Sequence, residues 1–401
     1  MNDQGNSNLP LSLKEFEITN FQCVQHTVIR DLPQNAPWIM MTGENGDGKT
    51  SLLQALAIAM YNTNWNFSWH EKTNSQSLVN VKIQTSLGRI LSCQFGADRN
   101  NYGGRSLDID NDNLDCLVSH DRDVSCSDQI FGYGASRLSI QGEMSAERKK
   151  TMQIDNLLNQ GGPLYNVERW LKDLELDARG DPVLQARNRR RMDLLAALMP
   201  NVDRIELDGS KVSYLEKGVP VPAHHLSAGH KSILAMIGDL LIRFADGQPG
   251  VEDPKDYVGI VLIDELEAHL HPKWQRQFPR KLSEVFPGVQ FIATTHSVLP
   301  FMGAPAGSVF LRVIRDAEHG TRVERLDIDV TRLLPNALLT SPLFDLDVIL
   351  NPSLESMDLL ETEDSFAEIE RQREQKRLLD RFAHEQAALL ARLSGCPQDS
   401  P

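Results

Sequence analysis

Hydrophobic and polar positions alternate along this chain in blocks that predict strands and helices in turn. Short strands are predicted over 13–18, 27–29 and 38–42, and the third stays apolar until it meets a glycine-rich turn. The residues after Lys49 are apolar at helical spacing and predict an amphipathic to buried helix. A strand, a loop and a helix in this order open an α/β unit.

The middle of the chain, from about 61 to 223, is less regular. Polar, Asn-rich and Gly-rich turns separate segments that favour antiparallel strands. Helices are predicted over 149–158, 168–176 and 181–198. No heptad pattern is sustained here, so a long coiled-coil arm is not expected.

From Leu226 onward the α/β pattern returns. Continuous apolar runs over 258–263 and 289–294 predict strands that are buried on both faces. The segments 308–315 and 321–328 predict a closing hairpin. Beyond Asn336 the pattern weakens, but a charged helix is predicted over 363–393 from the apolar positions Phe366, Ile369, Leu379, Phe382, Leu389 and Leu393.

The composition is that of an ordinary globular protein. The chain has 401 residues, of which 41% are hydrophobic and 24% charged, enough for one large domain with an insertion or for two domains. Five scattered cysteines without a Cys-x-x-Cys pair predict reduced, structural thiols. No apolar run reaches the roughly 18 residues that span a bilayer, and the polar start lacks the regions of a secretory signal. We therefore expect a flexible tail over 1–12 and a cytoplasmic protein with no membrane partner.

The net charge of −14 bears on nucleic-acid binding. Proteins that coat DNA non-specifically are usually basic, so contact with DNA would need a local basic patch. Arg187, Arg189, Arg190 and Arg191 form the candidate patch. The favoured alternative is that they lie on a solvated helix face.

The strongest chemical signal is the segment 43–50, which fits the phosphate-loop pattern G-x-x-x-x-G-K-[ST] between a strand and a helix. Its glycines let backbone amides point at phosphate oxygens, and the helix N-terminus favours an anion. Lys49 is expected to bridge the β- and γ-phosphates of ATP, and Thr50 to bind Mg²⁺. The predicted nucleotide-binding residues are Gly43, Glu44, Asn45, Gly46, Asp47, Gly48, Lys49, Thr50 and Ser51.

A second signal is the acidic pair Asp264–Glu265 at the end of the strand predicted over 258–263. Ligands of open α/β sheets bind at this end of a strand. Asp264 is expected to hold Mg²⁺ and Glu265 to polarise the attacking water. Adjacent acids also suit a solvated strand end, but the upstream phosphate loop favours the catalytic interpretation.

The segment Leu226–Lys231 supplies a third signal, because Ser227 suits the N-cap of the helix that follows. The segment resembles the LSGGQ signature of ATP-binding-cassette (ABC) proteins, with Ala228 and His230 as departures. In that family the signature reaches the γ-phosphate bound by the other subunit. The resemblance therefore implies a homodimer or a higher even oligomer, with Ser227, Ala228, Gly229 and His230 acting in trans.

Three further segments resemble parts of the same family. His296, at the end of the strand over 289–294, matches the switch histidine and implies a catalytic role beside Glu265 and Lys49. The segment Glu267–Pro272 resembles the D-loop of OLD-like ATPases, and a metal site at its two histidines is disfavoured because no third ligand is apparent. The segment 131–137 resembles a YGxxR sequence, within which Arg137 pairs either with phosphate or with a surface carboxylate. Gln141 is the candidate Q-loop contact to Mg²⁺ or its water.

Together these motifs resemble the RecF, SMC and OLD-like ATPases. The resemblance implies an α/β fold: an ABC-ATPase head, which is a P-loop NTPase, with a mixed sheet, an inserted helical subdomain and a C-terminal helix. The expected ATPase domain covers 13–330, with the inserted helical region over about 140–225, and a helical extension covers 331–401.

Within this group, the chain looks most like ATPases of bacterial anti-phage systems, such as the Septu, PARIS and retron-associated ATPases. The resemblance implies a nucleotide switch that controls a separate effector protein such as a nuclease. The alternative is a RecF- or SMC-like ATPase that binds DNA during repair. Asp327 and Asp329 offer only part of a TOPRIM nuclease site, so no nuclease is assigned to this chain. A degenerate binding module is disfavoured by the intact Lys49, Asp264 and Glu265.

Overall fold

The chain separates into two compact units, Met1–Asp347 and Val348–Pro401. The sequence analysis placed the start of the C-terminal extension at 331, before the end of the first unit. In the second unit the described residues are helical, within the helix predicted over 363–393. The computed structural model describes residues 8–61, 77–96, 126–137, 152–159, 162–208, 211–316, 318, 320–327, 330, 333–344, 374–379, 381–382 and 386.

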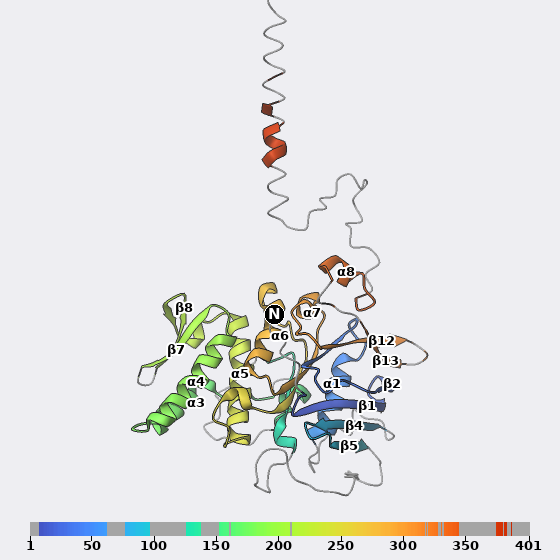
Figure 1. Ribbon diagram of the computed structural model, residues 1–401, viewed down its shortest axis with the longest axis horizontal. Helices are drawn as coiled ribbons and strands as arrows, with labels where there is room; N and C mark the ends of the chain where they lie inside the picture. Colours follow the sequence, from blue (N-terminus) through green and yellow to red (C-terminus); the bar gives the residue numbers. More distant parts are fainter. Residues whose placement is uncertain are drawn as a thin grey trace, which may run out of the picture. The chain divides into compact units, whose positions relative to one another are not determined.

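A six-stranded mixed sheet forms the centre of the first unit (Figure 1). Five of its strands are parallel, and the hairpin partner β13 is antiparallel at one edge. In sheet order the strands are β13 (Gly320–Leu326), β12 (Val309–Asp316), β3 (Trp38–Thr42), β11 (Val289–Thr294), β10 (Gly259–Ile263) and β6 (Ile130–Tyr133). The sequence analysis predicted antiparallel strands in the region of β6. That expectation is wrong for β6, because Ile130 pairs in parallel with Ile260.

Both faces of this sheet are buried, which explains its continuous apolar runs. Successive side chains of a strand point to opposite faces. In β3, Trp38 and Met40 join one hydrophobic cluster, whereas Ile39 and Met41 join the other. Trp38 also stacks on Phe291 of the neighbouring strand at 4.6 Å between ring centroids.

A second layer covers one face of the central sheet. It is a four-stranded antiparallel sheet, and the helix α1 (Lys49–Tyr61) packs between the two sheets (Figure 1). Its strands are β2 (Val24–Ile29), β1 (Leu11–Phe21), β4 (Leu78–Thr85) and β5 (Ile90–Gly96). Strand β1 starts inside the segment expected as a flexible tail, because Leu11 is fully buried and pairs with Thr85.

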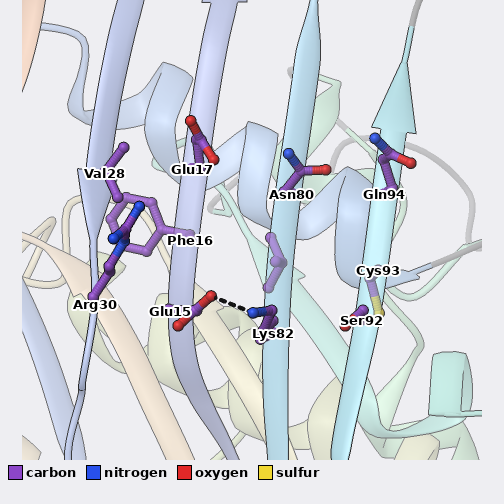
Figure 2. Close-up of a pocket in the computed structure, with 11 residues that line it drawn as sticks. Glu15, Phe16, Glu17, Val28, Arg30, Asn80, Lys82, Ser92, Cys93 and Gln94 are labelled. Atoms are coloured by element: carbon purple, nitrogen blue, oxygen red, sulfur yellow. Dashed lines mark ion pairs between the residues drawn. The ribbon is translucent and has the colours of Figure 1, made fainter. Parts of the chain in front are cut away.

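The outer face of this second sheet is polar (Figure 2). A shallow groove crosses it, lined by side chains of both charges. Glu15 and Lys82 form an ion pair there at 2.7 Å, and Glu17 and Arg30 lie nearby. No predicted nucleotide-site residue lines this groove. The candidate site is therefore built elsewhere, at the carboxyl ends of the central strands.

Helices cover the opposite face of the central sheet (Figure 1). Among the described residues, the helices on this face are α3 (Val167–Asp177), α4 (Pro182–Leu198), α5 (Ala228–Gly247), α6 (Pro272–Val285), α7 (Val298–Met302) and α8 (Pro335–Leu339). The short helix α2 (Asp155–Leu158) packs in the same cluster as α1. The inserted region was expected to be helical, but it also contains a three-stranded antiparallel sheet. Its strands are β7 (Val202–Asp208), β8 (Lys211–Glu216) and β9 (Val219–Val221). Among the described residues, no helix is both long and apolar enough to cross a membrane.

The four arginines of α4 do not form one basic face. Arg191 is buried, and its guanidinium lies over the Trp170 ring at 5.6 Å. Arg189 is exposed and pairs with Asp193 at 3.1 Å. Residues two positions apart lie on opposite sides of a helix, so part of this cluster must face the protein core. Arg191 therefore belongs neither to the candidate DNA patch nor to a solvated face, whereas Arg189 and Arg190 are exposed.

A buried polar network joins the central sheet to α5. The Asp239 carboxylate is fully buried and accepts from the Tyr133 hydroxyl at 2.9 Å, from Arg243 Nε at 2.6 Å and from the Tyr165 amide at 2.8 Å. Burial raises the pKa of Tyr133, so its hydroxyl stays a donor. Asp239 therefore links strand β6, the segment before α3 and the helix that follows Ser227.

We predict that Asp239→Asn lowers the free energy of unfolding by about 3–5 kcal/mol, because it breaks a buried ion pair by removing the carboxylate that Arg243 contacts. Tyr133→Phe removes only one neutral donor and should cost about 1–2 kcal/mol. Urea unfolding followed by tryptophan fluorescence measures both variants. Equal losses would show that the ion pair contributes no more than an ordinary hydrogen bond.

Candidate nucleotide site

The segment 43–50 forms a compact loop between β3 and α1. Gly46 and Gly48 have φ angles of 93° and 97°, a region that side chains other than glycine rarely adopt. A Cβ atom on Gly43 would lie 2.2 Å from the Val313 carbonyl oxygen, so this position leaves no room for a side chain. Asp47 Oδ2 accepts from the Glu44 amide at 2.6 Å and closes the loop.

The Lys49 side chain lies folded over this loop. Its ammonium donates to the carbonyl oxygens of Gly43 at 2.9 Å and Glu44 at 2.7 Å. Burial lowers the pKa of Lys49 below its ordinary value, and the charge of Asp47 partly opposes this shift. The lysine is thus held among oxygen acceptors at the mouth of the loop, where a phosphate would be a stronger partner.

Neighbouring elements brace the loop from two sides. From the β12–β13 hairpin, the Thr321 hydroxyl donates to the Asp47 carbonyl at 2.7 Å and Arg315 donates to the Gly46 carbonyl at 3.2 Å. On the other side, the Ser51 hydroxyl donates to Gln22 Oε1 in the β1–β2 turn. Ser51 therefore anchors α1, and the sequence analysis missed these braces because their partners lie far away along the chain.

The phosphate loop and the acidic strand end meet in the structure. The Thr50 hydroxyl donates to Asp264 Oδ2 at 2.8 Å, and the Thr294 hydroxyl donates to Asp264 Oδ1 at 2.5 Å. The oxygen of Thr294 also accepts from the Glu265 amide at 2.8 Å. One hydrogen-bond chain thus connects Thr50, Asp264, Thr294 and Glu265, of which Thr294 was not expected.

The hydroxyl of Thr50 and the carboxylate of Asp264 suit a magnesium ion. Mg²⁺ prefers hard oxygen ligands and is usually held by one or two protein groups together with substrate phosphates. These two oxygens lie beside the lysine-bearing loop at the place where phosphates are expected. The third expected ligand, Gln141, lies outside the described residues.

Arg137 is a structural clamp on the acidic segment. It is 2% exposed and donates to four carbonyl oxygens: Gly134 at 3.2 Å, Asp264 at 2.7 Å, Glu265 at 2.8 Å and Leu266 at 3.2 Å. Burial lowers the pKa of Arg137 to about 10, while the nearby charges of Asp264, Glu267 and Glu265 oppose this shift. Both roles considered from the sequence, a phosphate contact and a surface ion pair, are therefore wrong, because the guanidinium is buried against backbone.

Glu265 projects from a strained turn into solvent. Its φ angle is 47°, which is unusual for a residue with a side chain, and the clamp of Arg137 holds this conformation. The side chain is exposed at the carboxyl edge of β10. This position suits a carboxylate that acts on an external water molecule.

Glu267 connects this turn to the segment of the expected switch histidine. Its Oε1 accepts from the His296 amide at 2.5 Å, while Oε2 is buried without a hydrogen-bond partner among the described residues. The His296 side chain is exposed at the end of β11. The sequence analysis assigned Glu267 no role of its own. Its position two residues after Glu265 was the feature that could have indicated one.

The two D-loop histidines have different positions. His271 caps α6 and accepts from the Lys273 amide at 3.3 Å. His269 is exposed with a φ angle of 64°, and partial desolvation of its ring, together with the charge of Arg137, lowers its pKa. Its carbonyl oxygen would lie 2.6 Å from a Cβ atom on Gly229, which explains the glycine at that position.

The segment from Ser227 to His230 begins α5 as predicted. Ser227 is the N-cap and its Oγ accepts from the His230 amide at 3.2 Å. Ser227 and Ala228 are exposed, while Gly229 packs on the His269 backbone. The signature-like segment and the D-loop therefore lie side by side, and both present exposed residues.

The fold and the site define a P-loop ATPase. A family model described as "AAA domain" matches residues 15–173, and another described as "AAA domain, putative AbiEii toxin, Type IV TA system" matches residues 154–299. These matches confirm the expected fold class.

Several known proteins resemble the chain. It is 29% identical to the Septu protein PtuA of Bacillus mycoides (strain KBAB4) over 345 residues, which cover 83% of this chain and 45% of that protein. It is 36% identical to the Retron Ec83 probable ATPase of Escherichia coli over 107 residues, or 26% of this chain and 20% of that protein. The chain thus spans less than half the length of these two relatives.

Solved structures include the SMC head domain from Thermotoga maritima, with a TM-score of 0.44 and 13% identity over 79% of this chain and 100% of that one. The expected resemblance to Septu and retron ATPases is confirmed.

We predict that Arg137→Met accelerates hydrogen exchange of the amides in residues 264–268 by tenfold or more. The variant leaves carbonyls without a charged donor, a loss of about 1.5–3 kcal/mol for each strong bond. Mass spectrometry of exchanged peptides measures the effect. Arg189→Met, at an exposed position, serves as the matched control. Unchanged exchange at 264–268 would contradict the clamp.

Proposed function

We propose that this protein binds and hydrolyses Mg-ATP between two copies of the chain and acts as a nucleotide switch. The observation that carries the proposal is the 2.8 Å hydrogen bond from Thr50 to Asp264. This bond joins the phosphate loop to the acidic strand end, so one bound triphosphate would contact both. The bridge from Asp264 through Thr294 to the Glu265 amide supports a role for Glu265 near the same phosphates.

Each residue of the site has a definite task in this proposal. The loop amides and Lys49 bind the phosphates, and the lysine exchanges its two carbonyl partners for them. Thr50 and Asp264 hold Mg²⁺, which would neutralise phosphate charge when bound. Glu265 orients a water molecule for in-line attack, and His296 lies at the neighbouring strand end to contact the γ-phosphate.

The second copy completes the site from its signature-like segment. Ser227 and Ala228 are exposed and lie beside the D-loop, so another molecule can reach this segment. A symmetric pair would place the Ser227 segment of each copy against the nucleotide of the other. Hydrolysis would remove this shared ligand and reopen the pair.

The switch controls a separate effector in anti-phage defence, such as a nuclease. Support comes from the relatives, whose names place them in Septu and retron systems. The DNA-repair alternative loses part of its support because Arg191, one of the four arginines of the candidate patch, is buried against Trp170.

We predict that Glu265→Gln lowers ATP turnover about a hundredfold or more, the usual contribution of a general base. ATP binding should persist, and a closed dimer should accumulate on gel filtration with ATP. Lys49→Ala is the control that loses ATP binding itself. If Glu265→Gln hydrolyses ATP at the wild-type rate, the role assigned to Glu265 is wrong.

We predict that two inactive variants restore activity when mixed. Lys49→Ala and Ser227→Arg should each abolish turnover as homodimers. A heterodimer keeps one site with an intact lysine and an intact facing serine. Random mixing should therefore recover about a quarter of the wild-type rate, since half of the dimers carry one working site of two. Absence of any recovery, despite exchange of subunits, would argue against sites shared between copies.

A further inference from the structure

The imidazole of His230 has a defined tautomer. Its Nε2 atom lies 2.6 Å from the carbonyl oxygen of Pro200. A carbonyl oxygen only accepts hydrogen bonds, so Nε2 carries a hydrogen. In the neutral ring the other nitrogen, Nδ1, is then an acceptor.

The acceptor on His230 determines what the Ser227 hydroxyl can do. Ser227 Oγ lies 2.8 Å from Nδ1, so the hydroxyl donates its only hydrogen to the neutral ring. The oxygen itself accepts from the His230 amide at 3.2 Å. Phosphate oxygens need donors, and this serine has no hydrogen left to give.

A carboxylate lies ready to stabilise a charged His230. Glu216 Oε1 is 3.4 Å from Nδ1, and this oxygen is buried with no hydrogen-bond partner among the described residues. A proton taken from solvent onto Nδ1 would turn this atom into a donor toward Ser227 or Glu216. The Ser227 hydroxyl would then be free to rotate and donate to a phosphate.

We propose that His230 and Glu216 are positioning residues for Ser227, so that a proton on His230 switches the serine to donate to the nucleotide bound by the other copy. This inference rests on the proposed function of Ser227. Pro200 and Glu216 both belong to the inserted region, which thereby controls the signature-like segment. The glutamine found at this place in the signature that Ser227–His230 resembles could not act in this way, because it does not titrate.

Other titratable groups near His230 have contacts of their own. Lys231 donates to the His224 carbonyl at 2.8 Å, and the rings of His224 and His225 contact each other at 4.2 Å between centroids. His269 packs by its backbone on Gly229. Among the described residues, the carboxylate that contacts the His230 ring is therefore that of Glu216.

The test measures ATP-dependent closure of the full-length chain carrying Glu265→Gln, from about pH 5.5 to 8, where histidines commonly change charge. With His230 present, the ATP concentration for half-maximal dimer formation should fall about fivefold or more toward low pH, a typical coupling between linked sites. Adding His230→Gln should flatten this dependence, and adding Glu216→Gln should reduce it. Adding His224→Gln, the matched control at a neighbouring exposed histidine, should leave it unchanged.

The outcomes separate this inference from the proposed function. If dimers form with the same pH dependence after His230→Gln, the positioning role is wrong although the shared site stands. If ATP binds but dimers never form, the proposed function fails. A second measurement then still decides the hydrogen-bond assignment: nitrogen NMR of labelled histidines should show hydrogen on Nε2 of neutral His230. Hydrogen on Nδ1 would overturn the inference in any assembly state.

Discussion

The candidate site depends on the buried guanidinium of Arg137. Three acidic side chains, those of Asp264, Glu265 and Glu267, lie within a few residues of one another, and their charges act on this one cation. Its planar fork also satisfies carbonyl oxygens along residues 264–266. A lysine could not hold several carbonyls in this fixed geometry. The arginine thus balances the charge of these three carboxylates and also fixes the strained turn of Glu265.

Elsewhere the same kind of buried contact joins the layers of the unit. Asp239 gathers donors from β6, from the segment before α3 and from α5. Strand β6 leads directly into the turn that carries Arg137. The helix that begins after Ser227 and the clamp on Glu265 are therefore attached to the same strand. A shift of α5 would act on the turn of the proposed catalytic carboxylate through these buried hydrogen bonds.

The local pattern of apolar residues was sufficient to predict the strands that are buried along their whole length. The strands over 38–42 and 289–294 were predicted at their observed bounds because apolar runs end at clear turns. The parallel pairing of β6 was not predicted because the strand has four residues, includes Gly132 and pairs with a distant strand. The phosphate loop and acidic pair were found by spacing, and the structure brings them together. Arg137 was misassigned because a sequence does not show whether an arginine meets phosphate, carboxylate or backbone carbonyls.

The two halves of the proposed shared site differ in how many of their groups are already positioned to bind the nucleotide. The half with Lys49, Asp264 and Glu265 is held by contacts within the chain, so nucleotide finds most groups in place. The half with Ser227 is engaged elsewhere, because its hydroxyl is bonded to His230 and must be released before it can donate to phosphate. Closure of the proposed dimer would therefore break one hydrogen bond in each copy, a cost of about 0.5–1.5 kcal/mol per bond. In the proposed dimer, a threshold of this size, doubled by symmetry, would let the inserted region control whether bound ATP is sufficient for closure.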